Sequence, residues 1–140
     1  MKFNIDIYNS SSTLRIAIKK VEEALIRTFE GESIKQADVN VIYVDDVKIQ
    51  EINKEYLNHD RTTDVITFSL KDNEEKDSII DGEIYISTDT ARKQAAEYKV
   101  SFTDEILRLA VHGGLHLCGS EDDNDKKRAF MHELETKYIR

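Results

Sequence analysis

The order of apolar and polar residues along the chain predicts both strands and helices. Four short segments alternate apolar with polar residues or are rich in β-branched side chains, which is typical of strands. They span residues 2–8, 37–44, 64–70 and 79–87. Gly82 interrupts the last of these and indicates a bulge or a close backbone approach. The polar segment 71–78 predicts an exposed turn between the third and fourth strands.

Five other segments repeat apolar residues at helical spacing. They are residues 14–29, the segment that follows Asp45 and Asp46, and residues 88–98, 102–118 and 124–140. Tyr56 and Phe130 fall on the predicted apolar stripes of the second and fifth helices. About four strands and about five helices, without an internal repeat, predict one domain over residues 1–140, an α/β or α+β fold with helices packed on a sheet.

Polar residues at the helix starts are candidates for N-caps. Three serines at 10–12 precede the first helix, which is expected to stop at Gly31. Thr88 or Asp89 is expected to cap the third helix, and segment 101–104 (SFTD) has the spacing of a capping box at the start of the fourth.

Segment 112–122 (HGGLHLCGSED) contains the strongest chemical signal in the chain. Histidines four residues apart project from one face of a helix, with Cβ atoms about 5–6 Å apart, so His112 and His116 can reach one metal ion. Gly119 can take the positive φ that ends a helix, and Asp122 then follows on the returning chain. The spacing predicts a three-ligand site with an open position, as in catalytic zinc centres.

Other roles are open to the neighbouring residues. Asp122 could instead be the N-cap of the following helix, in which case Glu121 or Asp123 would compete for the ligand role. Glycine within a helix costs about 1 kcal/mol relative to alanine, so the pair at 113–114 indicates close approach of a substrate or of another backbone segment. Cys118 lies about 200° around the helix from His116 and is expected in the core.

Composition restricts the setting in which this site works. The 140 residues hold one cysteine, which excludes an internal disulfide and is typical of a reducing compartment. No apolar run approaches the ~20 residues of a membrane span, so a cytoplasmic protein without a membrane partner is expected. The net charge of −8 argues against nucleic acid unless a basic cleft gathers the lysines and arginines, which cluster at 19–20, 92–93, 126–128 and 137–140.

The ligand types predict hydrolysis. Asp122 would partly neutralise a divalent cation, and a fourth position would hold water, whose pKa the metal lowers towards ~7. Zinc is the first expectation, although the carboxylate favours harder metals somewhat. In metalloproteases with the pattern H-E-x-x-H the glutamate is the general base. Gly113 occupies that position here, which disfavours a peptidase, whereas cleavage of an RNA phosphodiester needs less from the protein.

Segment 112–122 also resembles the signature H-G-x-L-H-L-x-G-x-D-H of the YbeY family of bacterial endoribonucleases and ribosomal RNA maturation factors. Segments 63–68 (TDVITF) and 82–87 (GEIYIS) resemble its T-D-V-L-S-F and G-D-I-x-I-S stretches, and the helix with Asn53 is similar as well. The resemblance implies a zincin-like α+β domain with one zinc ion, held by His112, His116 and Asp122. It also implies cleavage of single-stranded RNA, maturation of the small-subunit ribosomal RNA 3′ end and ribosome quality control.

The sequence departs from this family pattern at two positions. Asp122 replaces the third histidine of the signature, and Leu57 stands where the family has an arginine. Arg61 lies nearby in the sequence and is a candidate for the missing catalytic cation, although an exposed loop arginine is the simpler interpretation. Thr63 and Asp64 could contact substrate or could only close the turn into the third strand.

Two functions therefore stay open. The first is a metal-dependent endoribonuclease that acts on ribosomal RNA. The second is a ribosome-assembly or RNA-binding factor, with the ribosome or ribosomal proteins as partners and a mainly structural metal. A metalloprotease is the least favoured function. The two remaining histidines, His59 and His132, are expected at the surface.

Overall fold

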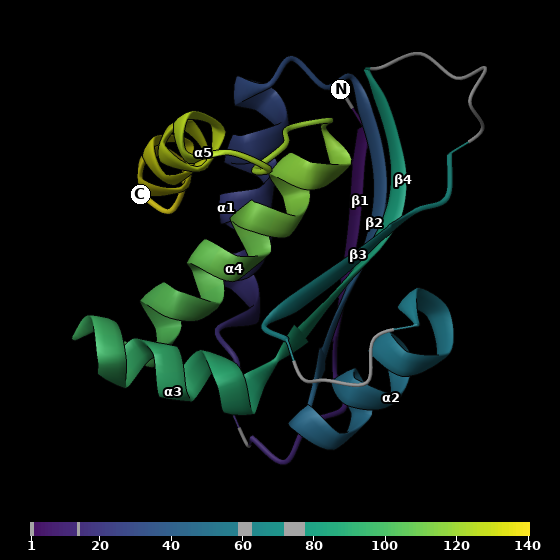
Figure 1. The fold of residues 1–140 in the computed structure, drawn as a ribbon. Helices are drawn as coiled ribbons and strands as arrows, with labels where there is room; N and C mark the ends of the chain where they lie inside the picture. The colour runs from purple at the N-terminus through teal and green to yellow at the C-terminus, as the bar shows by residue number, and fades with distance from the viewer. Residues whose placement is uncertain (1, 14, 59–62, 72–77) are drawn as a thin grey trace.

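A mixed four-stranded sheet forms the centre of the computed structural model, in the order β1-β2-β4-β3 (Figure 1). The structure describes residues 2–13, 15–58, 63–71 and 78–140. The strands are β1 (Lys2–Asn9), β2 (Gln36–Val44), β3 (Val65–Ser69) and β4 (Ile79–Ser87). β1, β2 and β4 are parallel to one another, and β3 pairs antiparallel with β4. β3 is therefore one edge of the sheet.

Helices cover the two faces of this sheet unequally (Figure 1). Their bounds are α1 (Ile18–Gly31), α2 (Asp46–Leu57), α3 (Thr88–Tyr98), α4 (Phe102–Leu117) and α5 (Asp125–Tyr138). The main core lies between the sheet and helices α1 and α4, where Val39, Val41 and Ile84 are completely buried. A smaller core on the opposite face holds Ile49 and Ile52 of α2 against Ile66 of β3. None of these helices, over the described residues, is long and apolar enough to cross a membrane.

The start of α1 differs from the prediction. The helix begins at Ile18 rather than at Leu14, with Ala17 at the N-cap. The serines at 10–12 have other partners: Ser11 donates to the side-chain oxygen of Asn9, and Ser12 donates through its backbone N–H and hydroxyl to Asp45. These contacts hold the serines in the loop that precedes α1, and even Ser12 lies five residues before the N-cap, so none of the three caps the helix.

The N-cap of α3 also differs from the prediction. Ser87 is the cap, and its hydroxyl accepts from the backbone N–H of Thr90 at 3.1 Å. Asp89 instead accepts from the backbone N–H of Asp46, the first residue of α2. The two helices thus begin side by side, and a side chain from one satisfies a backbone donor of the other.

Two predicted core aromatics lie at the surface. Tyr56 is 64% exposed and Phe130 is 59% exposed. Tyr56 packs edge-on against Phe68 at a centroid distance of 5.7 Å, outside the small core. In α5 the predicted stripe is confirmed at Tyr138, which is buried, and at Leu134, which packs against the main core, whereas Met131 and Glu135 are buried in place of Phe130. The buried side of α5 therefore includes a carboxylate, that of Glu135.

Glycines let α4 lie close to its neighbours. A Cβ atom at Gly113 would lie 2.7 Å from Cγ2 of Ile84, and one at Gly114 would lie 2.9 Å from Cδ2 of Leu25. These contacts are with side chains of β4 and α1, so the expectation of close approach by substrate or backbone is wrong for this pair. At Gly82 the added atom would lie 2.7 Å from the carbonyl oxygen of Phe68 and 2.7 Å from Leu117, a close approach of the kind predicted.

We expect Gly113→Ala to destabilise the protein although alanine is the better helix former. Overpacking a core costs about 1–3 kcal/mol, and the gain in helix propensity returns about 1 kcal/mol. Urea unfolding should therefore show a net loss of up to about 2 kcal/mol. Ile84→Ala in the same background should relieve part of the loss, and a double-mutant cycle without favourable coupling would contradict the packing explanation.

Candidate metal centre

Helix α4 carries both His112 and His116, and it ends just after His116, so that the following loop can bring Asp122 back towards them. Ser101 caps its start by accepting from the backbone N–H of Asp104. At its end Gly119 adopts a φ of 99°, its N–H donates to the carbonyl of His116, and the N–H of Ser120 donates to that of Leu115. This is the double hydrogen bond of a Schellman motif, which reverses the chain. The reversal leads directly to Asp122, as the sequence predicted.

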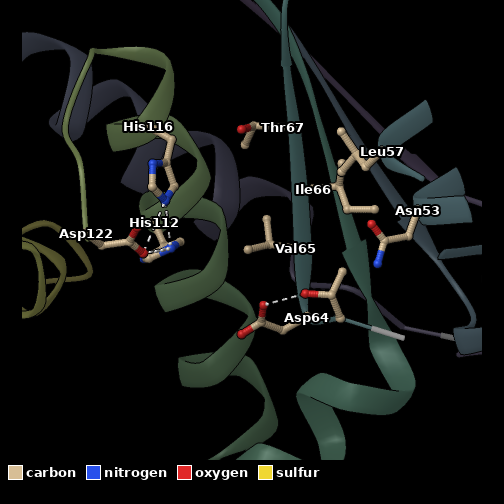
Figure 2. A pocket seen from close by; sticks show the side chains of 10 residues that line it. Asn53, Leu57, Asp64, Val65, Ile66, Thr67, His112, His116 and Asp122 are labelled. Atoms are coloured by element: carbon tan, nitrogen blue, oxygen red, sulfur yellow. Dashed lines mark hydrogen bonds and ion pairs between the residues drawn. The ribbon is translucent and has the colours of Figure 1, made fainter. Parts of the chain in front are cut away.

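The side chains of His112, His116 and Asp122 converge at one point (Figure 2). The Nε2 atoms of His112 and His116 are 3.0 Å apart, and each is 3.5 Å from Oδ2 of Asp122. Ligands at 2.0–2.1 Å from a tetrahedral ion are about 3.3–3.4 Å from one another. The three atoms therefore have the spacing and the donor types of a metal site. Their chemistry fits zinc and other divalent metals of similar size.

Asp122 is free for this role because a different residue caps α5. The side chain of Asn124 accepts from the backbone N–H of Lys127 at 2.8 Å. The competing acids Glu121 and Asp123 both pair with the Lys127 ammonium, at 2.7 and 3.2 Å. Among the described residues these contacts single out Asp122 as the carboxylate that joins the two histidines.

A hydrogen bond at the far nitrogen of each imidazole fixes its orientation. Nδ1 of His116 lies 3.1 Å from the carbonyl oxygen of Ser120, and Nδ1 of His112 lies 2.7 Å from Oε2 of Glu135. Burial acts to lower the pKa of His112, but the hydrogen bond and charge of Glu135, with the charges of Asp122 and Asp64, raise it above its ordinary value. Both rings therefore direct Nε2 towards Asp122.

The three groups lie in one wall of a cleft with a volume of about 380 Å³ (Figure 2). The opposite wall consists of β3 and the end of α2. Its residues are Asn53, Leu57, Thr63, Asp64, Val65, Ile66 and Thr67. The described lining contains two carboxylates, Asp64 and Asp122, and no lysine or arginine.

The cleft also locates the other residues that the sequence singled out. Asp64 is half-buried and accepts from Gln94 at 3.3 Å, which holds its carboxylate beside the cleft. Leu57 lines the cleft as an apolar side chain, where the family pattern has an arginine. Arg61 and His59 lie outside the described residues, as does most of the predicted turn at 71–78.

Cys118 and His132 are not part of the centre. Cys118 is half-buried against the main core, as expected. Burial, aided by the charge of Glu32, raises the pKa of its thiol to about 12 against a smaller opposing effect of Lys71, so it is protonated at neutral pH. The side chain of His132 is 71% exposed on α5, as predicted.

Sequence reasoning missed the residues behind His112. Glu135 belongs to α5 and is 3% exposed, and its second oxygen accepts from Arg108 at 3.0 Å. Arg108 in turn contacts Glu105, which is 1% exposed. The sequence contained one indication that Glu135 is buried. It lies four residues after Met131 and three before Tyr138, on the apolar side of the helix.

Known proteins resemble this chain over nearly its whole length. The family model described as Endoribonuclease YbeY matches residues 4–140. The protein called Endoribonuclease YbeY from Chlorobium phaeobacteroides (strain DSM 266) is 36% identical over 140 residues, which covers 100% of this chain and 95% of the relative. That from Chloroherpeton thalassium is 38% identical over 121 residues, 86% of this chain and 83% of the relative.

A solved structure supports the same comparison. The solution structure of TM1509 from Thermotoga maritima has a TM-score of 0.66 and 32% sequence identity, and the match covers 96% of this chain and 86% of that chain. This similarity, together with the four strands and five helices of the described part, confirms the predicted α+β fold class.

Proposed function

Because the chain belongs to the YbeY family of endoribonucleases, we propose that it cleaves single-stranded RNA with a divalent metal ion bound by His112, His116 and Asp122. Membership of that family confirms the resemblance inferred from segment 112–122 and makes the protein an RNA-cleaving hydrolase. The proposal extends to maturation of the small-subunit ribosomal RNA 3′ end and to ribosome quality control. It treats residues 1–140 as one functional domain in the cytoplasm.

One observation carries this proposal. Two imidazole nitrogens and one carboxylate oxygen meet within 4.8 Å of one another, in the wall of a cleft that has room for a substrate. A metal ion in such an open site polarises a phosphoryl oxygen and lowers the pKa of bound water. Zinc is our first choice, and Asp122 in place of a third histidine leaves other divalent metals as alternatives.

The residues of the cleft have different proposed roles. His112, His116 and Asp122 hold the metal in the wall of the cleft that faces β3. Gly113 offers no carboxylate for the base of a peptidase, which argues against proteolysis. Asp64 is the other carboxylate of the described lining, and we assign to it a contact with the reacting water or with a ribose hydroxyl, where it can accept a proton.

A ribosome-assembly factor with a structural metal is the second candidate. The observation that favours it is the described cleft lining, which has two carboxylates and no cation to neutralise RNA phosphates. If Arg61 does not supply that cation, substrate affinity has to come from elsewhere on the surface or from a ribosomal partner.

Cleavage assays with purified protein separate the two candidates. End-labelled single-stranded RNA should be cut, duplex RNA of the same sequence should resist, and EDTA should stop the reaction until Zn²⁺ or Mn²⁺ is added back. Cleavage that EDTA does not affect would contradict a metal-dependent mechanism. RNA binding without cleavage by metal-loaded protein would favour the assembly factor.

The assignment of the third ligand predicts a difference between adjacent acids. Asp122→Asn should weaken zinc binding by at least 100-fold, because it removes a charged ligand from a three-ligand site, whereas loss of an outer partner changes affinity by about 10–100-fold. Asp123→Asn is the matched control, since its carboxylate pairs with Lys127. Competition with a chromogenic chelator measures both affinities, and equal effects of the two substitutions would refute the assignment.

A further inference from the structure

A buried chain of charged side chains connects α4 to α5 and ends on a proposed metal ligand. Nε and Nη2 of Arg108 donate to the two oxygens of Glu105, at 2.9 and 2.5 Å. Nη1 of Arg108 donates to Oε1 of Glu135, and Oε2 of Glu135 contacts Nδ1 of His112 at 2.7 Å. Both carboxylates are almost completely buried. Every oxygen of the pair thus has a partner, and one of those partners is His112.

Stability alone does not account for this arrangement. Removing two carboxylates and a guanidinium from water is costly, and an apolar set of the same shape is often as stable or more so. The carboxylate nearest the metal site does something that an apolar residue could not do. It accepts a hydrogen bond from the nitrogen of His112 that faces away from Asp122.

We propose that Glu135 is a positioning residue that keeps the neutral His112 ring in the Nδ1–H tautomer, with the Nε2 lone pair directed at the metal. Arg108 has donors only, so it holds Glu135 in place without competing for the imidazole proton. The proposal rests on the metal role of His112 in the proposed function. It adds a residue that does not touch the metal or the RNA.

The second histidine has an equivalent arrangement built from the main chain. Nδ1 of His116 faces the carbonyl oxygen of Ser120, which is an acceptor only. A carboxylate and a carbonyl oxygen therefore impose the same tautomer on both rings. The far-side partner of each imidazole can accept a hydrogen bond and cannot donate one, so both partners favour the Nδ1–H tautomer. On the near side the two Nε2 atoms are 3.0 Å apart, and a cation bound between them would let both keep their lone pairs.

The variant Glu135→Gln tests this directly, because an amide has one acceptor where the carboxylate has two. Arg108 needs an acceptor and will take the amide oxygen, which leaves the amide NH₂ facing Nδ1 of His112. That donor favours the Nε2–H tautomer, in which the nitrogen directed at the metal is protonated. Glu133→Gln is the matched control, since Glu133 is exposed on the same helix.

Two measurements without RNA decide the proposal. Imidazole ¹⁵N NMR of the metal-free protein, in buffer alkaline enough for neutral rings, should show Nδ1–H for His112 in the native protein and in Glu133→Gln, and Nε2–H in Glu135→Gln. Chelator competition should show zinc affinity reduced by about 10–100-fold in Glu135→Gln and within twofold of native in Glu133→Gln.

The results remain interpretable if a variant fails to fold or if the nuclease assignment fails. An Nε2–H tautomer of His112 in the native protein overturns the proposal, and this measurement needs no variant. A folded Glu135→Gln protein that binds zinc with native affinity also overturns it. Absence of RNA cleavage would count against the proposed function only, since neither measurement uses RNA. Native protein that shows Nδ1–H, with zinc affinity lost in Glu135→Gln alone, supports the positioning role.

Discussion

Replacing His116 by alanine should abolish cleavage of single-stranded RNA and should weaken metal binding by more than 100-fold. The substitution removes one of the three proposed ligands, and loss of an outer-sphere partner alone costs about 10–100-fold in affinity. Without the metal the described lining of the cleft keeps Asp64 and contains no lysine or arginine to polarise a phosphoryl oxygen. We therefore expect cleavage rates to fall by at least a thousandfold, measured on end-labelled RNA with highly purified protein.

The fold should survive this substitution, which makes the test informative. His116 is 27% exposed on its side chain and lies near the end of α4, where alanine is a good helix former. His132→Ala removes a histidine with 71% side-chain exposure and is the control for the loss of any imidazole. Cleavage that persists in a folded His116→Ala protein would identify a contaminating nuclease and leave the binding function.

The convergence of the three proposed ligands was predictable because its geometry is local. A spacing of four residues places two side chains on one helix face, whatever the rest of the fold. The glycine at 119 ends the helix through hydrogen bonds to residues within five positions of it. Asp122 then follows within the same loop. The ligand role of these three side chains stays a prediction until metal binding is measured, but their convergence needed no long-range information.

The helix starts were harder to predict because several neighbouring residues were equally suitable as N-caps. Ser12, Ser87, Asp89 and Asp45 are all good capping types. Contacts between distant segments decided among them: Ser12 bonds to Asp45, 33 residues away, and Asp89 bonds to the backbone of Asp46, 43 residues away. A single sequence gives no means to see either contact, so the start of α1 and the cap of α3 were wrong for the same physical reason.

Glu135 escaped prediction for a related reason. A charged residue on an amphipathic helix usually marks the exposed side, so the apolar spacing of α5 gave no reason to place Glu135 in the interior. The hydrogen bond that makes its burial tolerable comes from Arg108, 27 residues earlier, and its functional partner is His112, 23 residues earlier. Charged residues of a helix usually face solvent, but Glu135 is buried because its partners on α4 satisfy its carboxylate.

The buried charges lead to the second large effect, which is on stability. Arg108→Leu should lower the free energy of unfolding by about 3 kcal/mol, because it leaves the buried Glu105 carboxylate without its guanidinium partner and leaves Glu135 without one of its two. At present burial opposes the charge on Arg108, but its hydrogen bonds and charge interactions with Glu105 and Glu135 outweigh that and raise its pKa above the ordinary value. Urea unfolding of metal-free protein measures the loss, and a change below about 0.5 kcal/mol would contradict it.

A triple variant separates this stability effect from the positioning of His112. Replacing Glu105 by Met, Arg108 by Leu and Glu135 by Met removes all three charges together, so no unpaired ion remains in the interior. Stability should then return to within about 1 kcal/mol of native, because apolar groups of similar volume substitute well for buried ion sets. Zinc affinity should stay low, since nothing would fix the tautomer of His112. Recovery of both properties would show that the charged chain serves packing alone.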